Sequence, residues 1–272
     1  MLTNLPIAVQ VFSVRDDASA DFKGTMQKLK DMGYDGVELA GLYSYTPAQI
    51  RQMLDEVGIP AISAHVPYAE LLADPEGTIA AYKEIGCQYI AFPYLTEDVR
   101  HGTPAFAETL EHMRHICEVA KSMGMPMLYH NHDFEFVKMD NGQFGLDYMY
   151  DAIDADLLQT ELDTCWVKVA GQDPAAYIRK YAGRCPVVHL KDFYKEGEAS
   201  NMYELIGLND KKETKGIFEF RPVGHGLQNM PEIVKAAEES GAQWLVVEQD
   251  RSVGRTPLEA VKMSIDFLKN DK

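Results

Sequence analysis

Histidines and carboxylates stand at the carboxyl ends of short apolar runs throughout this sequence. The histidines at such ends are His65, His130, His132 and His189, and the acidic residues are Glu38, Glu161, Asp163, Glu248 and Asp250. Imidazole and carboxylate groups together suit Mn2+, Co2+, Zn2+ or Fe2+ better than Ca2+. The same groups remove and return protons in acid–base catalysis. These residue types therefore indicate a divalent metal site that supports proton transfer.

Two polar residues separated by one position recur at four of these ends. The pairs are His130 with His132, Glu161 with Asp163, His189 with Lys191, and Glu248 with Asp250. Side chains at positions i and i+2 of a strand point to the same face. If each strand turns this face inward, Asp163, His189 and Glu248 converge from three consecutive strands. His130, one strand earlier, would complete a set of four metal ligands.

Several of these residues also have a purely structural interpretation. A single histidine at a strand end is usually hydrogen-bonded within the fold, so the metal hypothesis depends on the joint pattern. Glu161 could lie in a surface turn or pair with an arginine, and it ranks below the other carboxylates. Asp133 and Glu135 are expected in a loop after the fifth strand.

Eight short apolar runs alternate with amphipathic segments, which is the pattern of parallel βα units. The expected strands are 7–12, 36–40, 60–65, 88–92, 126–130, 158–163, 186–190 and 243–248. The expected helices are 22–32, 47–57, 75–85, 104–123, 146–153, 174–181, 230–240 and 257–268. Glycine follows many of these helices, as expected where a helix ends.

Eight such units predict a closed (β/α)8 barrel, that is, a TIM barrel. The length of 272 residues is close to the roughly 250 of one such domain, so a single domain over 1–272 is expected. A doubly wound sheet is the alternative, but no glycine-rich phosphate fingerprint follows the first strand. Active sites of these barrels lie at the carboxyl ends of the strands. One long loop, at about 193–228 after the seventh strand, carries His225 and is expected to be functional.

The charge and the cysteines exclude several classes of function. The net charge is −16, with 42 acidic and 26 basic residues, which disfavours binding to nucleic acid and to anionic membranes. The four cysteines are too few and too scattered for a disulfide framework or a CxxC metal site, so buried, reduced thiols are expected. The sequence shows no signal peptide and no membrane-spanning run, which predicts a cytoplasmic protein, although a removed leader would leave the same pattern.

The residues as a whole resemble the xylose isomerase-like TIM barrels, a family described broadly as sugar phosphate isomerases/epimerases. The likeness spans essentially the whole chain. It includes the segments QVFSVR at 10–15, YDGVE at 34–38, SAH at 63–65, YHNH at 129–132, LDT at 162–164, VHLKD at 188–192 and VE at 247–248. Each segment is weak evidence alone, but their order and spacing together are specific.

The resemblance implies one divalent metal ion, with Mn, Co, Zn, Fe and Mg all possible. The family binds this ion through Glu, Asp, His and Glu on strands five to eight. Asp163, His189 and Glu248 match three of these positions, whereas His130 stands where the family has the first Glu. Trp166 also departs from the pattern, because many members have a substrate-contacting His at that place.

These departures bear on which groups move protons. A histidine bound to metal has no free lone pair, so His130 can scarcely be ligand and base together. The acid–base work is then assigned to Glu248 or His132, with Lys191 stabilising negative charge on the substrate. The residues expected to contact the substrate are Glu38, His65, Trp166 and His225.

The resulting hypothesis is an isomerase or epimerase of a sugar or sugar phosphate, acting through an enediolate. A lyase or dehydratase on a keto-sugar or keto-inositol is the alternative, because elimination needs no base on the opposite face of the substrate. A non-catalytic sugar-binding barrel is a third interpretation. A DNA repair nuclease shares the fold, but the net charge of −16 disfavours it. The expected partner is a small carbohydrate, and a homodimer is possible.

Overall fold

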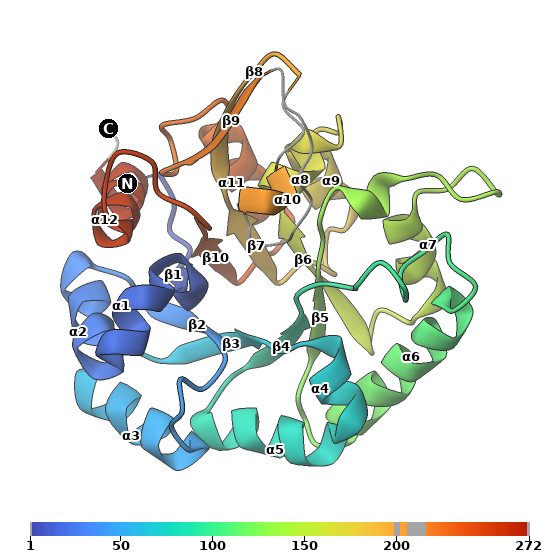
Figure 1. The fold of residues 1–272 in the computed structure, drawn as a ribbon, viewed down its shortest axis with the longest axis horizontal. Helices are drawn as coiled ribbons and strands as arrows, with labels where there is room; N and C mark the ends of the chain where they lie inside the picture. The colour runs from blue at the N-terminus through green and yellow to red at the C-terminus, as the bar shows by residue number, and fades with distance from the viewer. Residues whose placement is uncertain (1, 199–201, 206–215, 271–272) are drawn as a thin grey trace.

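The computed structural model describes residues 2–198, 202–205 and 216–270. Eight parallel strands close into a barrel in the order β1-β10-β7-β6-β5-β4-β3-β2 (Figure 1). The strands are β1 Ile7–Gln10, β2 Gly36–Ala40, β3 Ala61–His65, β4 Tyr89–Phe92, β5 Met127–His130, β6 Leu158–Asp163, β7 Val187–Leu190 and β10 Trp244–Val247. The predicted (β/α)8 barrel is confirmed, and the doubly wound alternative is wrong because the sheet closes on itself.

Helices surround the barrel, as Figure 1 shows. The main ones are α2 Phe22–Met32, α3 Pro47–Val57, α5 Pro75–Ile85, α6 Phe106–Ser122, α7 Gly145–Ala152, α9 Pro174–Lys180, α11 Met230–Glu239 and α12 Pro257–Asn270. Their ends follow from local chemistry. The Asp21 carboxylate accepts a hydrogen bond from the backbone of α2 at its start, and Gly33 ends the same helix at a φ of 103°, a conformation that favours glycine.

Short helices that the sequence pattern did not reveal follow several strands on the carboxyl-end side. They are η1 Val11–Val14, α1 Arg15–Ala20, α4 Tyr68–Ala73, η2 Phe134–Phe136 and α8 Thr164–Val169. The first of them corrects the predicted strand 7–12, which ends at Gln10. The Gln10 side chain accepts a hydrogen bond from the Phe12 backbone N–H at 3.0 Å and so caps the 3-10 helix η1. These short turns bring side chains to the mouth of the barrel.

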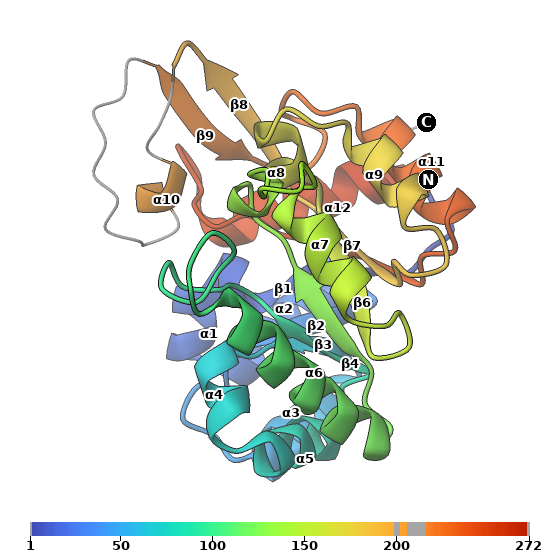
Figure 2. The same cartoon turned by 90° about the vertical axis from the view of Figure 1, so that its right-hand side faces the viewer.

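The predicted long connection at about 193–228 contains regular structure that the sequence pattern did not reveal. Strands β8 Asp192–Glu196 and β9 Ile217–Arg221 form an antiparallel pair, and α10 Met202–Leu205 lies between them in sequence. Figure 2 shows this pair projecting beyond the barrel. The Asp192 carboxylate holds the base of this β8–β9 pair, because it accepts backbone hydrogen bonds from Gly224, Gly226 and Gln228.

The inside of the barrel has an apolar floor and a polar layer above it. The floor is made of Ala8, Ile62, Tyr89, Ala91, Leu128, Val187 and Val246. Two residues further along several strands, the inward positions are polar, as in the step from Val187 to His189. The floor therefore supports a buried layer of ionisable side chains at the carboxyl ends of the strands.

The four cysteines are buried and free, as predicted. Among the described residues, no helix is long and apolar enough to cross a membrane.

Candidate active site

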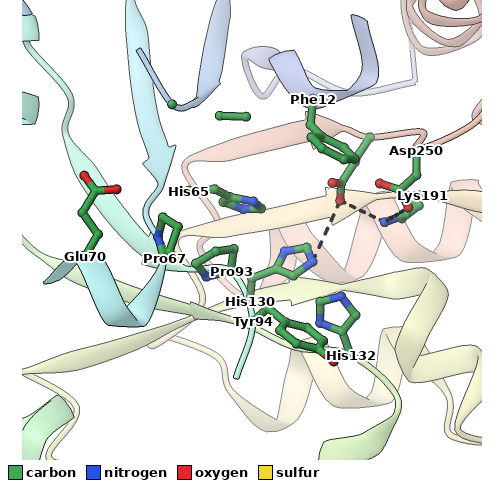
Figure 3. A pocket seen from close by; sticks show the side chains of 13 residues that line it. Phe12, His65, Pro67, Glu70, Pro93, Tyr94, His130, His132, Lys191 and Asp250 are labelled. Carbon is green, nitrogen blue, oxygen red and sulfur yellow. Dashed lines mark ion pairs between the residues drawn. The ribbon is translucent and has the colours of Figure 1, made fainter. Parts of the chain in front are cut away.

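A cavity of about 460 Å3 opens at the carboxyl ends of the barrel strands (Figure 3). Its lining consists of Phe12, Ala40, Gly41, His65, Pro67, Glu70, Pro93, Tyr94, His130, His132, Lys191, Glu248 and Asp250. Aromatic and proline side chains form part of the wall. His130, His132, Lys191 and Asp250 lie on one side of the cavity, and Glu70 lies on the other (Figure 3). Such a cavity, with apolar walls and a few convergent polar groups, is the usual form of a small-molecule site.

Four side chains from neighbouring strands meet at the base of this cavity. We call His130, Asp163, His189 and Glu248 the upper set; one potential ligand atom from each lies within 4.8 Å of the others. The Nε2 atom of His130 lies 3.6 Å from Asp163 Oδ2 and 3.9 Å from Glu248 Oε2. The Nδ1 atom of His189 is 3.0 Å from Glu248 Oε2. The structure thus brings together the four residues that the sequence suggested as metal ligands.

The local fold explains how Asp163 is held. It is the N-cap residue of α8, and its Oδ1 accepts hydrogen bonds from the backbone N–H groups of Cys165 and Trp166. This arrangement leaves Oδ2 buried and without a hydrogen-bond partner among the described residues. One carboxylate oxygen therefore holds the helix, and the other lies near the His130 ring.

The upper set fits a divalent cation. Buried polar atoms are nearly always hydrogen-bonded, so an unpartnered Asp163 Oδ2 at such a place indicates a missing partner. Burial lowers the pKa of His130 well below its usual range, so its ring is neutral and able to act as a ligand. The Lys191 ammonium and His189 hold the pKa of the buried Glu248 well below its usual range, which keeps this carboxylate ionised. Two imidazoles and two carboxylates are a suitable donor set for Mn2+, Co2+, Fe2+ or Zn2+.

Lys191 is the cation nearest to the upper set among the cavity residues. Its Nζ atom lies 2.6 Å from Asp250 Oδ2, 3.3 Å from Glu248 Oε2 and 3.6 Å from Asp163 Oδ2. Burial acts against its charge, but these carboxylates raise the pKa of Lys191 well above its usual value. The charged group also lies 5.3 Å from the centre of the Trp166 ring. Lys191 is therefore a fixed positive charge beside the upper set.

His132 lies on the cavity wall next to His130. Its ring contacts Tyr94 edge-on at 5.1 Å and stacks on Phe134 at 5.6 Å between centroids. The carboxyl group of the buried Glu135 accepts a hydrogen bond from the His132 backbone N–H at 2.8 Å. The Nδ1 atom of His132 has no hydrogen-bond partner in the described part of the chain. Burial lowers the pKa of this histidine well below its usual value, so the ring is neutral.

A second group of side chains lies deeper in the barrel. We call His65, His130, Glu161 and His189 the inner set, because potential ligand atoms of these four also lie within 4.8 Å of one another. These side chains come from β3, β5, β6 and β7 respectively. Glu161, on β6, is fully buried. The alternative that Glu161 lies in a surface turn is therefore wrong.

Glu38 supports the inner set from β2. It accepts a hydrogen bond from Gln10 Nε2 at 2.8 Å and one from the Ser63 hydroxyl. Its Oε1 lies 3.1 Å from His65 Nε2 and 2.8 Å from His189 Nε2. Although burial opposes ionisation, His65 and His189 lower the pKa of Glu38, so this carboxylate is charged.

The four residues predicted to contact substrate occupy different environments. His65 lines the cavity. Glu38 is fully buried beneath it, and Trp166 is fully buried behind His132 and Lys191. His225 lies in a turn beside Phe267, with 6.4 Å between ring centroids, and is not among the lining residues. For Glu38, Trp166 and His225, contact with substrate stays a prediction.

Several cavity residues were not singled out from the sequence. They are Phe12, Pro67, Glu70, Pro93 and Tyr94, and most of them directly follow a barrel strand. The rule that loops after the strands build the site could have identified them. Four of them are apolar or aromatic and gave no chemical signal in the sequence, and Glu70 lies in α4, a helix that the sequence pattern did not predict.

Known proteins resemble this chain over nearly its whole length. The sequence profile of the family described as xylose isomerase-like TIM barrel matches residues 26–271. A protein of Geobacillus kaustophilus (strain HTA426) named inosose dehydratase is 23% identical over 274 residues, covering 89% of this chain and 85% of that protein.

Two solved structures share the fold. One is a sugar phosphate isomerase/epimerase from Parabacteroides distasonis ATCC 8503, with a TM-score of 0.76, 21% identity and coverage of 97% of both chains. The other is a probable 3-DHS dehydratase from Bacillus anthracis, with a TM-score of 0.72, 14% identity and coverage of 98% of this chain and 100% of that chain. At such identities the likeness shows the architecture alone.

Proposed function

Because the chain belongs to the xylose isomerase-like TIM barrel family, we propose that it is a metal-dependent lyase that removes water from a keto-sugar or keto-inositol. The observation that carries this proposal is the asymmetry of the cavity. Its carboxylates near the upper set, Glu248 and Asp250, both come from the β10 side and both contact Lys191. The facing β5 side offers imidazoles, His130 and His132.

This arrangement favours elimination over epimerisation, because Lys191 pairs with both Glu248 and Asp250, and Glu248 and His130 would hold the metal ion. His132 is then left as the acid–base group of the cavity. Inverting a carbon centre requires one group to take a proton from one face of the substrate and another group to deliver a proton to the opposite face. Elimination of water can use a single acid–base group, which takes the proton next to the carbonyl and returns it to the departing hydroxyl. The curated relative from Geobacillus kaustophilus carries the name of a dehydratase, which supports the same choice.

His130, Asp163, His189 and Glu248 would hold the metal ion. When bound, the ion supplies Lewis-acid polarisation of the substrate carbonyl. The charged Lys191 ammonium stabilises the negative charge that develops on the carbonyl oxygen. Phe12, Pro93 and Tyr94 in the cavity wall would exclude water from one face of the substrate's ring.

His132 is the acid–base group in this proposal. Its ring lines the cavity, and because burial lowers the pKa of His132 well below its usual value, the neutral ring keeps one nitrogen lone pair. It accepts the proton from the carbon next to the carbonyl, and the electrons of that C–H bond form the new double bond. The bond to the neighbouring hydroxyl breaks, and that hydroxyl leaves as water with the proton from His132. The net change is the loss of one water molecule.

The test is an incubation of keto-inositols and keto-sugars with the metal-loaded protein in D2O, followed by NMR. We expect a dehydrated product, and we expect His132→Gln to lower turnover by roughly 10^2- to 10^4-fold with its metal content retained. Deuterium exchange with a changed stereocentre and no loss of water would overturn the lyase assignment. Full turnover in the His132 variant would overturn the role of this residue.

An isomerase or epimerase is the second candidate. It is favoured by Lys191 and His132, which reach the cavity from different strands and could act on two faces of one carbon. The same D2O experiment decides between the two, because epimerisation exchanges the proton without producing water.

A further inference from the structure

Two histidines in the barrel present both of their ring nitrogens to acidic groups, on opposite sides. We propose that the inner set is a second cation position, suited to Zn2+ or a similar imidazole-preferring ion. This inference goes beyond the proposed reaction, in which neither His65 nor Glu161 takes a step. The upper set enters only as the position with which the inner one is compared.

The geometry of the inner set centres on one oxygen. Glu161 Oε2 lies 2.7 Å from His65 Nε2, 3.3 Å from His130 Nδ1 and 3.5 Å from His189 Nε2. The ring centroids of His65 and His130 are 4.8 Å apart, and those of His130 and His189 are 4.7 Å apart. Figure 3 shows His65 and His130 projecting into the same region of the cavity. Three imidazole nitrogens from β3, β5 and β7 therefore surround one carboxylate from β6.

Hydrogen bonds leave this group unsatisfied. His130 Nδ1, His189 Nε2 and Glu161 Oε1 are buried and have no hydrogen-bond partner among the described residues. The His189 nitrogen does form a close ion-pair contact with Glu38 Oε1 at 2.8 Å, and Glu161 Oε2 shares a hydrogen bond with His65 Nε2 at 2.7 Å. Buried polar atoms without partners are costly. A cation among these atoms would give each of them a ligand bond.

The donor types distinguish the two positions. The inner set offers three imidazoles and one carboxylate, whereas the upper set offers two of each. Imidazole suits Zn2+, Cu2+ and Ni2+, and carboxylate suits Mn2+ and Mg2+. We therefore expect Zn2+ to favour the inner position and Mn2+ to favour the upper one.

The shared histidines couple the two positions. His130 points its Nε2 atom toward the upper carboxylates and its Nδ1 atom toward Glu161 of the inner set. His189 points its Nδ1 atom toward the upper carboxylates and its Nε2 atom toward Glu161. An imidazole that binds metal through both nitrogens must give up its remaining proton, which makes double occupancy unfavourable. Zn2+ in the inner position would consequently weaken binding of Mn2+ in the upper one.

The experiment compares two variants that each remove a ligand from one position only. His65→Ala affects the inner set, and Asp163→Asn affects the upper set. Binding of Zn2+ and of Mn2+ to metal-free protein is measured by calorimetry, and free Mn2+ is followed by electron paramagnetic resonance during addition of Zn2+. His115→Ala, an exposed histidine on α6, is the matched control. His65→Gln provides a second inner variant, and circular dichroism confirms that each variant is folded.

We expect the His65 variants to lose more than about 100-fold in Zn2+ affinity, beyond the roughly 10- to 100-fold typical of an outer-shell change. The Mn2+ affinity of the same variants should fall by less than their Zn2+ affinity. Asp163→Asn should show the opposite pattern, and Zn2+ should displace Mn2+ from the wild type. Equal losses for both ions in the His65 variants, or Zn2+ binding that depends on Asp163 alone, would overturn the inner position. Mn2+ binding that survives Asp163→Asn would instead count against the upper set and the proposed lyase.

Discussion

The two halves of the barrel contribute different things to the cavity. Strands β5, β6, β7 and β10, which are neighbours in the closed sheet, and the residues that directly follow them supply all four residues of the upper set together with His132 and Lys191. Strands β1 to β4 carry Gln10, Glu38 and Ser63, which are tied to one another by hydrogen bonds, and they lead into walls such as Phe12 and Pro93.

The difference indicates a division of labour between the halves. In the half formed by β5, β6, β7 and β10, buried atoms such as Asp163 Oδ2 and His132 Nδ1 have no hydrogen-bond partner within the described part of the chain, which is where a bound ligand could interact. In the other half, Glu38 is held on both oxygens. We infer that the first half determines the reaction and the second supports it and shapes the substrate. Each of the following variants tests this division.

The largest effect on turnover is expected for Glu248→Gln, which changes the residue directly after β10. This change keeps the shape but removes a charged ligand, so bound metal should be lost and turnover should fall by roughly a thousandfold or more, as several kcal/mol of electrostatic stabilisation disappear. Metal analysis and kcat measurements check this. Glu118→Gln, an exposed glutamate on α6, is the matched control. Normal turnover in the Glu248 variant would refute the upper set as the reaction centre.

Lys191→Met should have the next largest effect. Methionine keeps an unbranched apolar stem but removes the charge that lies 2.6 Å from Asp250. Turnover should fall by roughly 10^2- to 10^3-fold, as when one stabilising donor is lost at a developing oxyanion. Metal content, measured in parallel, should stay near that of the wild type. Loss of metal together with turnover would show that Lys191 supports the ligands and does not act on the substrate.

Glu38→Gln probes the supporting half. Because Glu38 touches His65 and His189 and does not line the cavity, its change should weaken metal binding by about 10- to 100-fold, as outer partners of metal ligands do. With saturating metal, kcat should recover to within a few-fold of the wild type. Calorimetry and kinetics across metal concentrations separate the two effects. A kcat that stays low at every metal concentration would move Glu38 into the reacting half.

The reacting half was largely predictable from the sequence. The i and i+2 spacing of Glu161 with Asp163 and of His189 with Lys191 follows from strand geometry, and the structure places these residues inside the barrel. Glycines after helices, such as Gly33, marked most helix ends, and the strand Leu158–Asp163 was predicted with its observed bounds.

The supporting half of the barrel and the β8–β9 pair were harder to predict. The burial of Glu161 depends on contacts with His65, 96 positions away in sequence, which no local pattern encodes. The pairing of β8 with β9 depends on a similar long-range contact, between Asp192 and Arg221 at its base. Walls such as Phe12 were missed because η1 interrupts the predicted first strand after Gln10. These features arise from tertiary contacts and not from periodicity.

A smaller effect is expected for Phe12→Ala, which alters a wall in the supporting half. Loss of an aromatic contact of about 1.4 kcal/mol would raise KM roughly tenfold, since this energy corresponds to a factor of ten. The kcat value should change little, because Phe12 contributes no polar group to the upper set. Steady-state kinetics with the best substrate of the D2O screen provide the measurement. A larger drop in kcat than rise in KM would contradict the division between the halves.

The smallest effect on turnover is expected for Glu135→Gln, whose main consequence is for stability. Burial raises the pKa of Glu135 from 4.5 to about 8, so the folded chain holds a proton that the unfolded chain releases above about pH 4.5. The folded state binds more protons in this window, and the free energy of unfolding therefore falls as pH rises from about 4.5 to about 8, by at most about 1.4 kcal/mol per pH unit. Glutamine has no such proton but can still accept the hydrogen bond from the His132 backbone. Urea unfolding of the metal-free protein at several pH values measures this effect. The free energy of unfolding should fall more steeply with pH for the wild type than for the variant. Equal slopes of this free energy against pH would show that Glu135 is ionised in the folded chain.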